Sequence, residues 1–123
     1  MPRILAVDDE KAIADIIEQF LVKNGFDVVS LSDAEEALKM IRGAEKFDLI
    51  VLDIKMPKIT GVEILKDMTE RNDTTPVIIL SGSIGIQENV DVLRELGYDE
   101  EEILYKPIDL FELLNKIKKE LSL

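Results

Sequence analysis

The sequence predicts an α/β fold with three layers, in which helices cover both faces of a parallel sheet. Short runs rich in Val, Ile and Leu alternate about five times with longer stretches whose apolar residues recur at helical spacing. The chain has 123 residues, of which 46% are hydrophobic and 33% charged, the balance of one compact domain. We therefore expect a single domain over residues 1–123, without an effector domain of its own.

The apolar runs have the length of strands, and turn residues separate them from the stretches that follow. The third run is apolar on both faces, which is typical of a central strand in a parallel sheet. Pro76 opens the fourth run, and Pro107 follows the fifth. We expect strands at residues 4–7, 26–31, 49–52, 77–80 and 103–105.

The stretches between these runs carry start and stop signals of helices. Three begin with Ser, Thr or Asp followed three residues later by Glu, the spacing of a capping box. Three end at a glycine, which can adopt the left-handed conformation that closes a helix. The pairs are Ser32 with Glu35, Thr60 with Glu63, and Asp109 with Glu112, and the glycines are Gly25, Gly43 and Gly97.

The polarity of the runs indicates the order of the strands. The first and third runs are the most apolar and therefore central, whereas the second and fifth are more polar and suit the edges. Right-handed crossovers between parallel strands place helices on both faces. We expect a flavodoxin-like three-layer sandwich, with five helices around a five-stranded parallel sheet of order 2-1-3-4-5.

The composition excludes several classes of function. With 26 acidic and 15 basic residues, the formal net charge is −11, so we expect neither direct nucleic-acid binding nor membrane insertion. The absence of Cys and His excludes disulfides, a thiolate nucleophile and a structural zinc site. The first apolar run reaches Asp8 too soon for a signal peptide, which predicts a cytoplasmic protein. Any bound metal would need oxygen ligands.

Polar residues stand at or just after the ends of four predicted strands. Asp8 and Asp9 follow the first, Asp53 follows the third, Ser81 follows the fourth and Lys106 follows the fifth. Because the carboxyl ends of parallel strands open on one edge, we expect these side chains to share a crevice. Three carboxylates at close range repel one another, and a small divalent cation with oxygen ligands would offset that repulsion. Mg²⁺ is therefore the expected cofactor.

Asp53 is the best candidate for a covalent nucleophile. Without Cys, a Ser–His pair or a Lys in an apolar pocket, a carboxylate remains, and a carboxylate that attacks phosphorus gives an acyl phosphate. In the predicted strand order Asp53 lies between the other two acids and Lys106. A metal on one side and an ammonium on the other could stabilise the phosphoryl oxygens.

Four segments together resemble the receiver domain of two-component response regulators. They are VDDE at 7–10, LDIKMPKITG at 52–61, SGS at 81–83 and YKPI at 105–108. Each is weak alone, but the four in this order over nearly the whole chain are specific. The resemblance implies a signalling switch that promotes its own phosphorylation and dephosphorylation at Asp53, and not an enzyme with a separate substrate. The donor would be a phosphohistidine on a sensor histidine kinase or a histidine phosphotransfer protein.

The resemblance also implies roles at the site. The hydroxyl of Ser81 and the ammonium of Lys106 would contact the phosphoryl group, and the Lys106–Pro107 bond would be cis. A downstream target would bind the face formed by the helix that ends at Gly97, the fifth strand and the last helix, on a monomer or a phosphorylation-dependent dimer. The implied metal ligands are Asp9, Asp53 and the backbone carbonyl of Lys55, with Asp8 acting through water.

The chain departs from the family pattern in its switch region. Ile103 stands where the family usually has an aromatic residue, and Tyr105, on the same strand face, could take over part of that role. The glycine-rich loop at 81–85 could move when the Ser81 hydroxyl is drawn toward new charge. The segment before Lys106 is slightly longer than usual, and its acidic run at 99–102 is expected to be a solvated loop.

Three other functions fit the same fold. A flavin electron carrier is disfavoured because no phosphate-cradling loop follows the first strand and the chain has no Trp. An aspartyl phosphatase would need a second acid near its nucleophile, yet Lys55 stands two residues after Asp53. An unphosphorylated receiver-like binding module is disfavoured by the intact set of acids.

Overall fold

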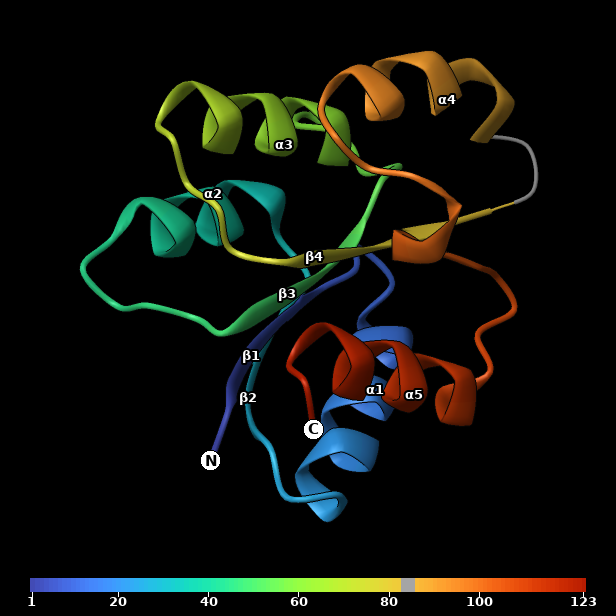
Figure 1. The fold of residues 1–123 in the computed structure, drawn as a ribbon. Helices are drawn as coiled ribbons and strands as arrows, with labels where there is room; N and C mark the ends of the chain where they lie inside the picture. The colour runs from blue at the N-terminus through green and yellow to red at the C-terminus, as the bar shows by residue number, and fades with distance from the viewer. Residues whose placement is uncertain (83–85) are drawn as a thin grey trace.

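The computed structural model describes residues 1–82 and 86–123, and within these ranges every side chain outside 86–90. Strands and helices alternate as the sequence predicts (Figure 1). Ser83 and Gly85, which the predicted mobile loop includes, lie outside the described residues. The elements are β1 (Arg3–Val7), α1 (Lys11–Lys23), β2 (Asp27–Leu31), α2 (Ala34–Arg42), β3 (Leu49–Asp53), α3 (Gly61–Glu70), β4 (Val77–Ser81), α4 (Ile86–Glu95), the 3₁₀ helix η1 (Glu100–Glu102), β5 (Ile103–Tyr105) and α5 (Leu110–Glu120).

The sheet has five strands in the order β2-β1-β3-β4-β5, and every neighbouring pair is parallel. The central strands β3 and β4 are buried along their whole length, whereas the edge strand β2 is exposed or only partly buried throughout. This contrast matches the polarity of the runs in the sequence. The predicted fold class and strand order are therefore confirmed.

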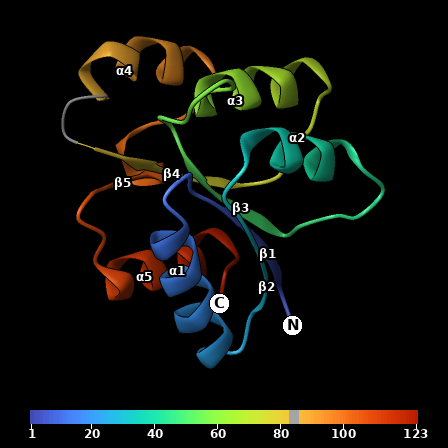
Figure 2. The ribbon, with the colours of Figure 1, turned by 180° about the vertical axis from the view of Figure 1, so that it is seen from behind.

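Helices cover both faces of the sheet. Helices α2, α3 and α4 lie on one face, and α1 and α5 lie on the other (Figures 1 and 2). Alternate side chains of each strand enter the two cores because successive residues of a strand point to opposite faces. In β1, Leu5 and Val7 belong to the core under α2 and α3, whereas Ile4 and Ala6 belong to the core under α1 and α5.

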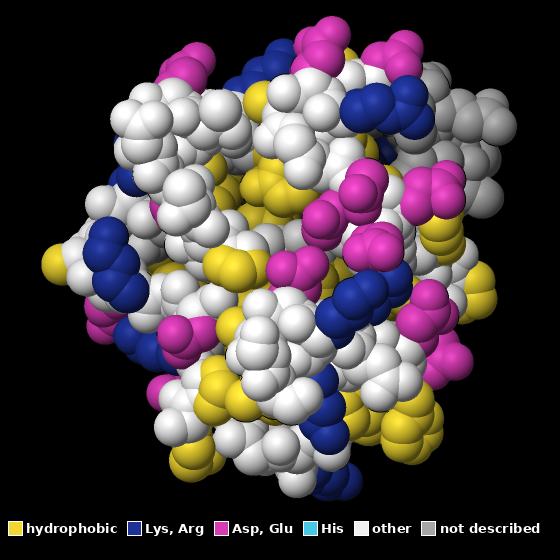
Figure 3. Space-filling view, viewed as in Figure 1, with side chains coloured by type: hydrophobic (Ala, Val, Ile, Leu, Met, Phe, Trp, Pro, Cys, Tyr) yellow, Lys and Arg dark blue, Asp and Glu magenta, His cyan; other side chains and the backbone are white. Residues whose placement is uncertain are grey.

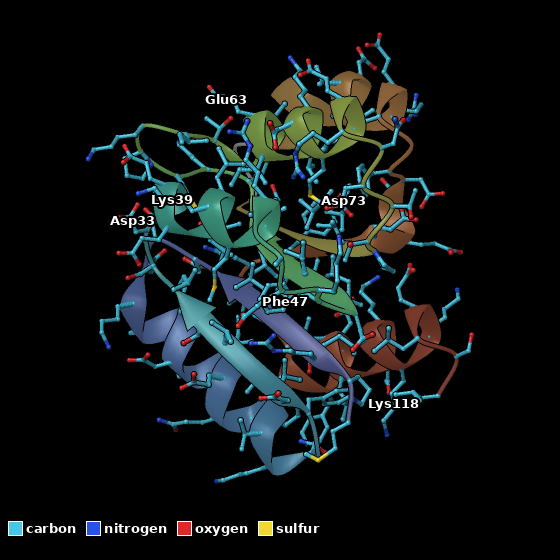
Figure 4. All side chains as sticks on the ribbon, turned by 90° about the vertical axis from the view of Figure 1, so that its left-hand side faces the viewer. Asp33, Lys39, Phe47, Glu63, Asp73 and Lys118 are labelled. Carbon is cyan, nitrogen blue, oxygen red and sulfur yellow. The ribbon has the colours of Figure 1, made fainter. Side chains whose placement is uncertain are left out.

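Side-chain caps fix the starts of three helices. The predicted caps Thr60 and Asp109 accept hydrogen bonds from backbone N–H groups in the first turns of α3 and α5. The predicted cap Ser32 is wrong, because Asp33 occupies that position in α2 and accepts from the N–H of Glu35 (Figure 4). Ser and Asp are both good caps, so adjacent residues of these types leave the boundary ambiguous by one position.

The acidic run at 99–102 is largely exposed, as predicted, but it is not a plain loop, because Glu100–Glu102 form the 3₁₀ helix η1. Asp99 caps the 3₁₀ helix η1 in a capping box that includes Glu102. The backbone carbonyl of Glu101 accepts a hydrogen bond of 2.9 Å from Lys116, and its carboxylate lies 3.3 Å from Lys119 Nζ. Two lysines of α5 therefore anchor this segment.

The two ends of the chain lie at the same edge of the sheet. The amino end enters β1 directly, and α5 runs back antiparallel to the strands, so both termini lie at the edge where the strands begin (Figure 1). The opposite edge, where the strands end, carries the polar residues that the sequence singles out.

Candidate functional site

The carboxyl edge of the sheet gathers the predicted acids and the lysine. Asp8 and Asp9 follow β1, and Asp53 is the last residue of β3. One carboxylate oxygen from each of these three residues lies within 4.8 Å of the other two. Lys106, just after β5, places Nζ 3.0 Å from Asp8 Oδ2 and 3.4 Å from Asp53 Oδ2. Three acids and one amine from distant parts of the chain therefore share one pocket.

Backbone groups orient the two buried acids. The N–H of Glu10 donates to Asp8 Oδ1 over 2.9 Å, and the N–H of Lys55 donates to Asp53 Oδ1 over 3.3 Å. The N–H of Lys106 donates to the carbonyl of Ser81 over 2.8 Å, which continues the pairing of β4 with β5. The second oxygen of each acid, Oδ2, lies near Lys106 Nζ, at 3.0 Å for Asp8 and 3.4 Å for Asp53.

Gly61 fixes the backbone beneath Asp53. Its N–H donates to the carbonyl of Ile54 over 2.9 Å. A Cβ at this position would lie 2.6 Å from the carbonyl oxygen of Asp53 and 2.6 Å from Cα of Ile54. The start of α3 can approach the end of β3 this closely only because residue 61 has no side chain.

The pocket stabilises negative charge incompletely. Burial, the charge of Asp8 and a contact with Asp9 raise the pKa of Asp53 to about 7, although Lys106 and the N–H of Lys55 act in the opposite direction. Burial alone would lower the pKa of Lys106, but its contacts with Asp8 and Asp53 outweigh burial and raise it. Lys106 is therefore positively charged at neutral pH and lies next to Asp53, whose ionisation is made less favourable by burial.

The donor set fits a small oxygen-binding cation. Asp8 is fully buried, and its Oδ2 makes no hydrogen bond among the described residues, although Lys106 Nζ lies 3.0 Å away. A buried, unsatisfied carboxylate oxygen is unfavourable unless another group binds there. The pocket, of about 460 Å³, is open to solvent and reaches Asp9, Asp53 and Lys55. In Figure 3, several Asp and Glu side chains, in magenta, lie close to a Lys or Arg side chain, in dark blue, near the centre of the view.

The predicted switch residues lie along the β4–β5 pair. Ser81 is fully buried, and its hydroxyl donates to the carbonyl of Gly82 over 3.0 Å. Ile103 is buried in the core beneath α2 and α3, whereas Tyr105, paired in register with Ser81, is 42% exposed. The Lys106–Pro107 peptide bond is cis.

Comparison with known proteins decides the family. The response regulator receiver domain family matches residues 4–118. The chain belongs to this family. Receiver domains of response regulators are the phosphoacceptor switches of two-component systems, and this chain is one of them.

The relatives of this receiver domain include full-length regulators. It is 34% identical over 116 residues to the alkaline phosphatase synthesis transcriptional regulatory protein PhoP of Bacillus subtilis, covering 94% of this chain and 47% of PhoP. It is 35% identical over 116 residues to the response regulator MprA of Mycobacterium leprae, covering 94% of this chain and 49% of MprA. The chain thus spans about half the length of these relatives.

Solved receiver domains share the fold closely. A CheY-like receiver domain protein from Methanospirillum hungatei superimposes with a TM-score of 0.88 at 34% identity, covering 99% of this chain and 94% of that one. The Francisella response regulator 1452 receiver domain has a TM-score of 0.86 at 34% identity, covering 99% and 98%. Within the described ranges, no helix of this receiver domain combines the length and the apolarity that a bilayer crossing requires.

Sequence reasoning missed two contributors to the pocket. The close approach of Gly61 to β3 was not foreseen, although this glycine ends one of the four quoted segments. Glu10 was quoted in another segment, yet its carboxylate lies 3.7 Å from Lys106 Nζ and it lines the pocket. A glycine directly after a capping Thr, and a Glu at a helix start, were the available signals.

Proposed function

We propose that this receiver domain accepts a phosphoryl group on Asp53 in a Mg²⁺-dependent reaction, with a phosphohistidine of a sensor histidine kinase or a histidine phosphotransfer protein as the donor. The observation that carries this proposal is the surroundings of Asp53, which is 2% exposed, has carboxylate oxygens of Asp8 and Asp9 within 4.8 Å and has Lys106 Nζ 3.4 Å from its Oδ2. No other carboxylate among the described residues combines these neighbours with an open pocket.

The proposed transfer is a single displacement at phosphorus. One carboxylate oxygen of Asp53 attacks the phosphorus atom, and a new O–P bond forms as the P–N bond to the imidazole breaks. The electron pair of that bond leaves on the imidazole nitrogen, which takes up a proton. The product is an aspartyl phosphate, which water later hydrolyses on the same domain, so the domain turns over no separate substrate.

The residues that would hold Mg²⁺ are Asp9, Asp53 and the backbone carbonyl of Lys55, with Asp8 acting through water. Bound Mg²⁺ would neutralise charge that develops on the phosphoryl oxygens. Lys106 would pair with the same oxygens from the β5 side, and the distance of 3.4 Å between its Nζ and Asp53 Oδ2 supports this role. The unsatisfied Oδ2 of Asp8 supports a cation in this pocket.

The proposed output is a population shift on the α4–β5–α5 face. Ser81 would turn its hydroxyl from the carbonyl of Gly82 to a phosphoryl oxygen, and β4 would transmit that movement to Tyr105, its partner in register. A downstream target protein would bind this face, on a monomer or on a dimer formed after phosphorylation. We expect the monomer and the dimer to act in the cytoplasm.

The test is phosphorylation by a small phosphodonor, read by intact-protein mass spectrometry. With Mg²⁺, the wild type should gain the mass of one phosphoryl group, and this gain should disappear with EDTA or in Asp53→Asn. Asp27→Asn, a change of the same type on the exposed edge strand β2, should keep the modification. Modification that persists in Asp53→Asn would overturn the assignment, and no modification of the wild type would favour a binding module without phosphorylation.

A further inference from the structure

Three carboxylates compete for the ammonium of Lys106, and the third belongs to a residue with no role in the proposed reaction. Nζ lies 3.0 Å from Asp8, 3.4 Å from Asp53 and 3.7 Å from Glu10. The first two acids are buried, whereas the side chain of Glu10 is 64% exposed at the mouth of the pocket. Glu10 can therefore meet both Lys106 and whatever enters from solvent.

Helix structure does not account for the position of the Glu10 side chain. Glu10 is the N-cap residue of α1, a position where Ser, Thr, Asp or Asn usually accepts a hydrogen bond from the first turn. The Glu10 side chain makes no such bond and reaches toward Lys106 instead. Its backbone is fixed, because its N–H donates to Asp8 Oδ1. The backbone that carries the Glu10 side chain is thus fixed at the rim, and the carboxylate lies 3.7 Å from Lys106 Nζ.

Charge at the rim acts on incoming phosphodonors, which are anions. Besides Glu10, the pocket lining includes Asp9 and Asp53, with Lys55 and Lys106 as its cations. A carboxylate at the mouth repels a donor in proportion to the donor's net negative charge, and salt weakens that repulsion. The same carboxylate draws Lys106 away from the place where a phosphoryl oxygen would bind. Both effects slow a highly charged donor most.

We propose that Glu10 is a specificity-determining residue, which discriminates among phosphodonors by net charge through repulsion at the pocket mouth and through its contact with Lys106. The proposal rests on the proposed phosphorylation of Asp53. It predicts slow reaction with small dianionic donors and a smaller penalty for donors with less negative charge.

The test compares two small donors on the same protein at saturating Mg²⁺. Acetyl phosphate is a dianion near neutral pH, whereas phosphoramidate carries less net negative charge. Glu10→Gln should raise the second-order rate constant with acetyl phosphate about three- to tenfold, and with phosphoramidate by a clearly smaller factor. Added salt should accelerate the reaction of the wild type with acetyl phosphate more than that of the variant.

Two further variants separate the causes. Glu10→Asp keeps the charge but shortens the reach to Lys106, so it should keep most of the discrimination between donors and of the salt dependence. Glu36→Gln removes an exposed acid from α2 and should leave the ratio of the two rate constants unchanged. Circular dichroism spectra that match the wild type would show that each variant folds.

The outcomes distinguish this proposal from the proposed function. A wild type that neither donor phosphorylates would refute the assignment of Asp53. A wild type that is phosphorylated, with equal acceleration of both donors or none in Glu10→Gln, would refute the role of Glu10 and leave Asp53 in place.

Discussion

At the scale of single residues, the burial of Asp53 makes the stability of the folded protein depend on pH. Its pKa of about 7 lies above the usual value of 3.8, so the folded state binds its proton more tightly than the unfolded state does. The free energy of unfolding should therefore fall as pH rises from about 4 to about 7. Above about pH 7 the buried charge of Asp53 continues to lower the free energy of unfolding.

Asp53→Asn should remove this cost. One pKa unit corresponds to about 1.4 kcal/mol, so at pH 8 without Mg²⁺ we expect the variant to be more stable by a few kcal/mol. Near pH 4 the difference should shrink because Asp53 is protonated in the folded wild type. Urea unfolding at both pH values measures this, and a variant that is less stable at pH 8 would contradict it.

Gly61→Ala should distort the backbone that carries Asp53. The added methyl would lie 2.6 Å from the Asp53 carbonyl, so the end of β3 or the start of α3 must shift. Forced overpacking of this kind costs about 1–3 kcal/mol. We expect a lower midpoint in urea and slower phosphorylation of Asp53.

The sequence predicted that the acids and Lys106 converge, but it did not predict the additional contacts made by Glu10 and Gly61. Asp8, Asp53 and Lys106 stand at strand ends, and parallel topology alone brings strand ends together. The reach of Glu10 to Lys106 depends on a side-chain conformation, and the contact of Gly61 with β3 depends on how α3 packs. Neither has a signature in the spacing of residues.

At the scale of elements, a cluster of charges joins α2 to α3. Asp67 of α3 accepts hydrogen bonds from Arg42 of α2 and, over 2.9 Å, from Arg71. The hydrogen bond from Arg42, supported by Arg71, lowers the pKa of Asp67 to about 2 against the opposing effect of burial. The ionised form is thus favoured in the folded state.

Asp67→Asn should destabilise the protein at neutral pH. Both arginines are partly exposed, so the loss should be about 0.5–1 kcal/mol. Because the folded pKa lies below 3.8, this contribution is complete above about pH 4 and disappears as pH falls through about 2. Urea midpoints of the two proteins at pH 7 and pH 3 test this, and an equal difference at both would contradict it.

Element boundaries show where sequence patterns lose resolution. The runs at 77–80 and 103–105 predicted β4 and β5 to within one residue, because apolar strands in a buried sheet have little freedom. The start of α2 moved from Ser32 to Asp33, since both residues can cap. The capping box of η1 has the spacing of the boxes read in the sequence, whereas its contacts with Lys116 and Lys119 of α5 come from far along the chain and have no local signature.

At the scale of the whole molecule, the proposed cation binding would be coupled to folding. The acids that would hold Mg²⁺ come from β1 and β3, so the site exists only when the sheet is formed. Mg²⁺ should therefore raise the melting temperature, with a stabilisation of about 2.7 kcal/mol at one hundred times its Kd. Differential scanning calorimetry with Mg²⁺ and then EDTA measures the effect.

Asp53→Asn is the control for this effect. Loss of a ligand should weaken or remove the Mg²⁺-dependent shift in the variant. An equal shift in both proteins would place the cation elsewhere on the acidic surface.

The overall topology was predictable because polarity separates edge strands from central ones. The first and third runs were predicted to be central and the second to be an edge, and β3 is buried throughout whereas β2 is not, so polarity favours the observed order. The total charge of −11 carries no such positional information.

Both ends of the polypeptide leave the molecule at the edge of the sheet remote from the pocket (Figure 1). A folded protein fused to Met1 or Leu123 would lie at that edge and leave the mouth of the pocket accessible to a phosphodonor. Tags and fluorescent reporters for the assays above can therefore be joined at either end without shielding Asp53.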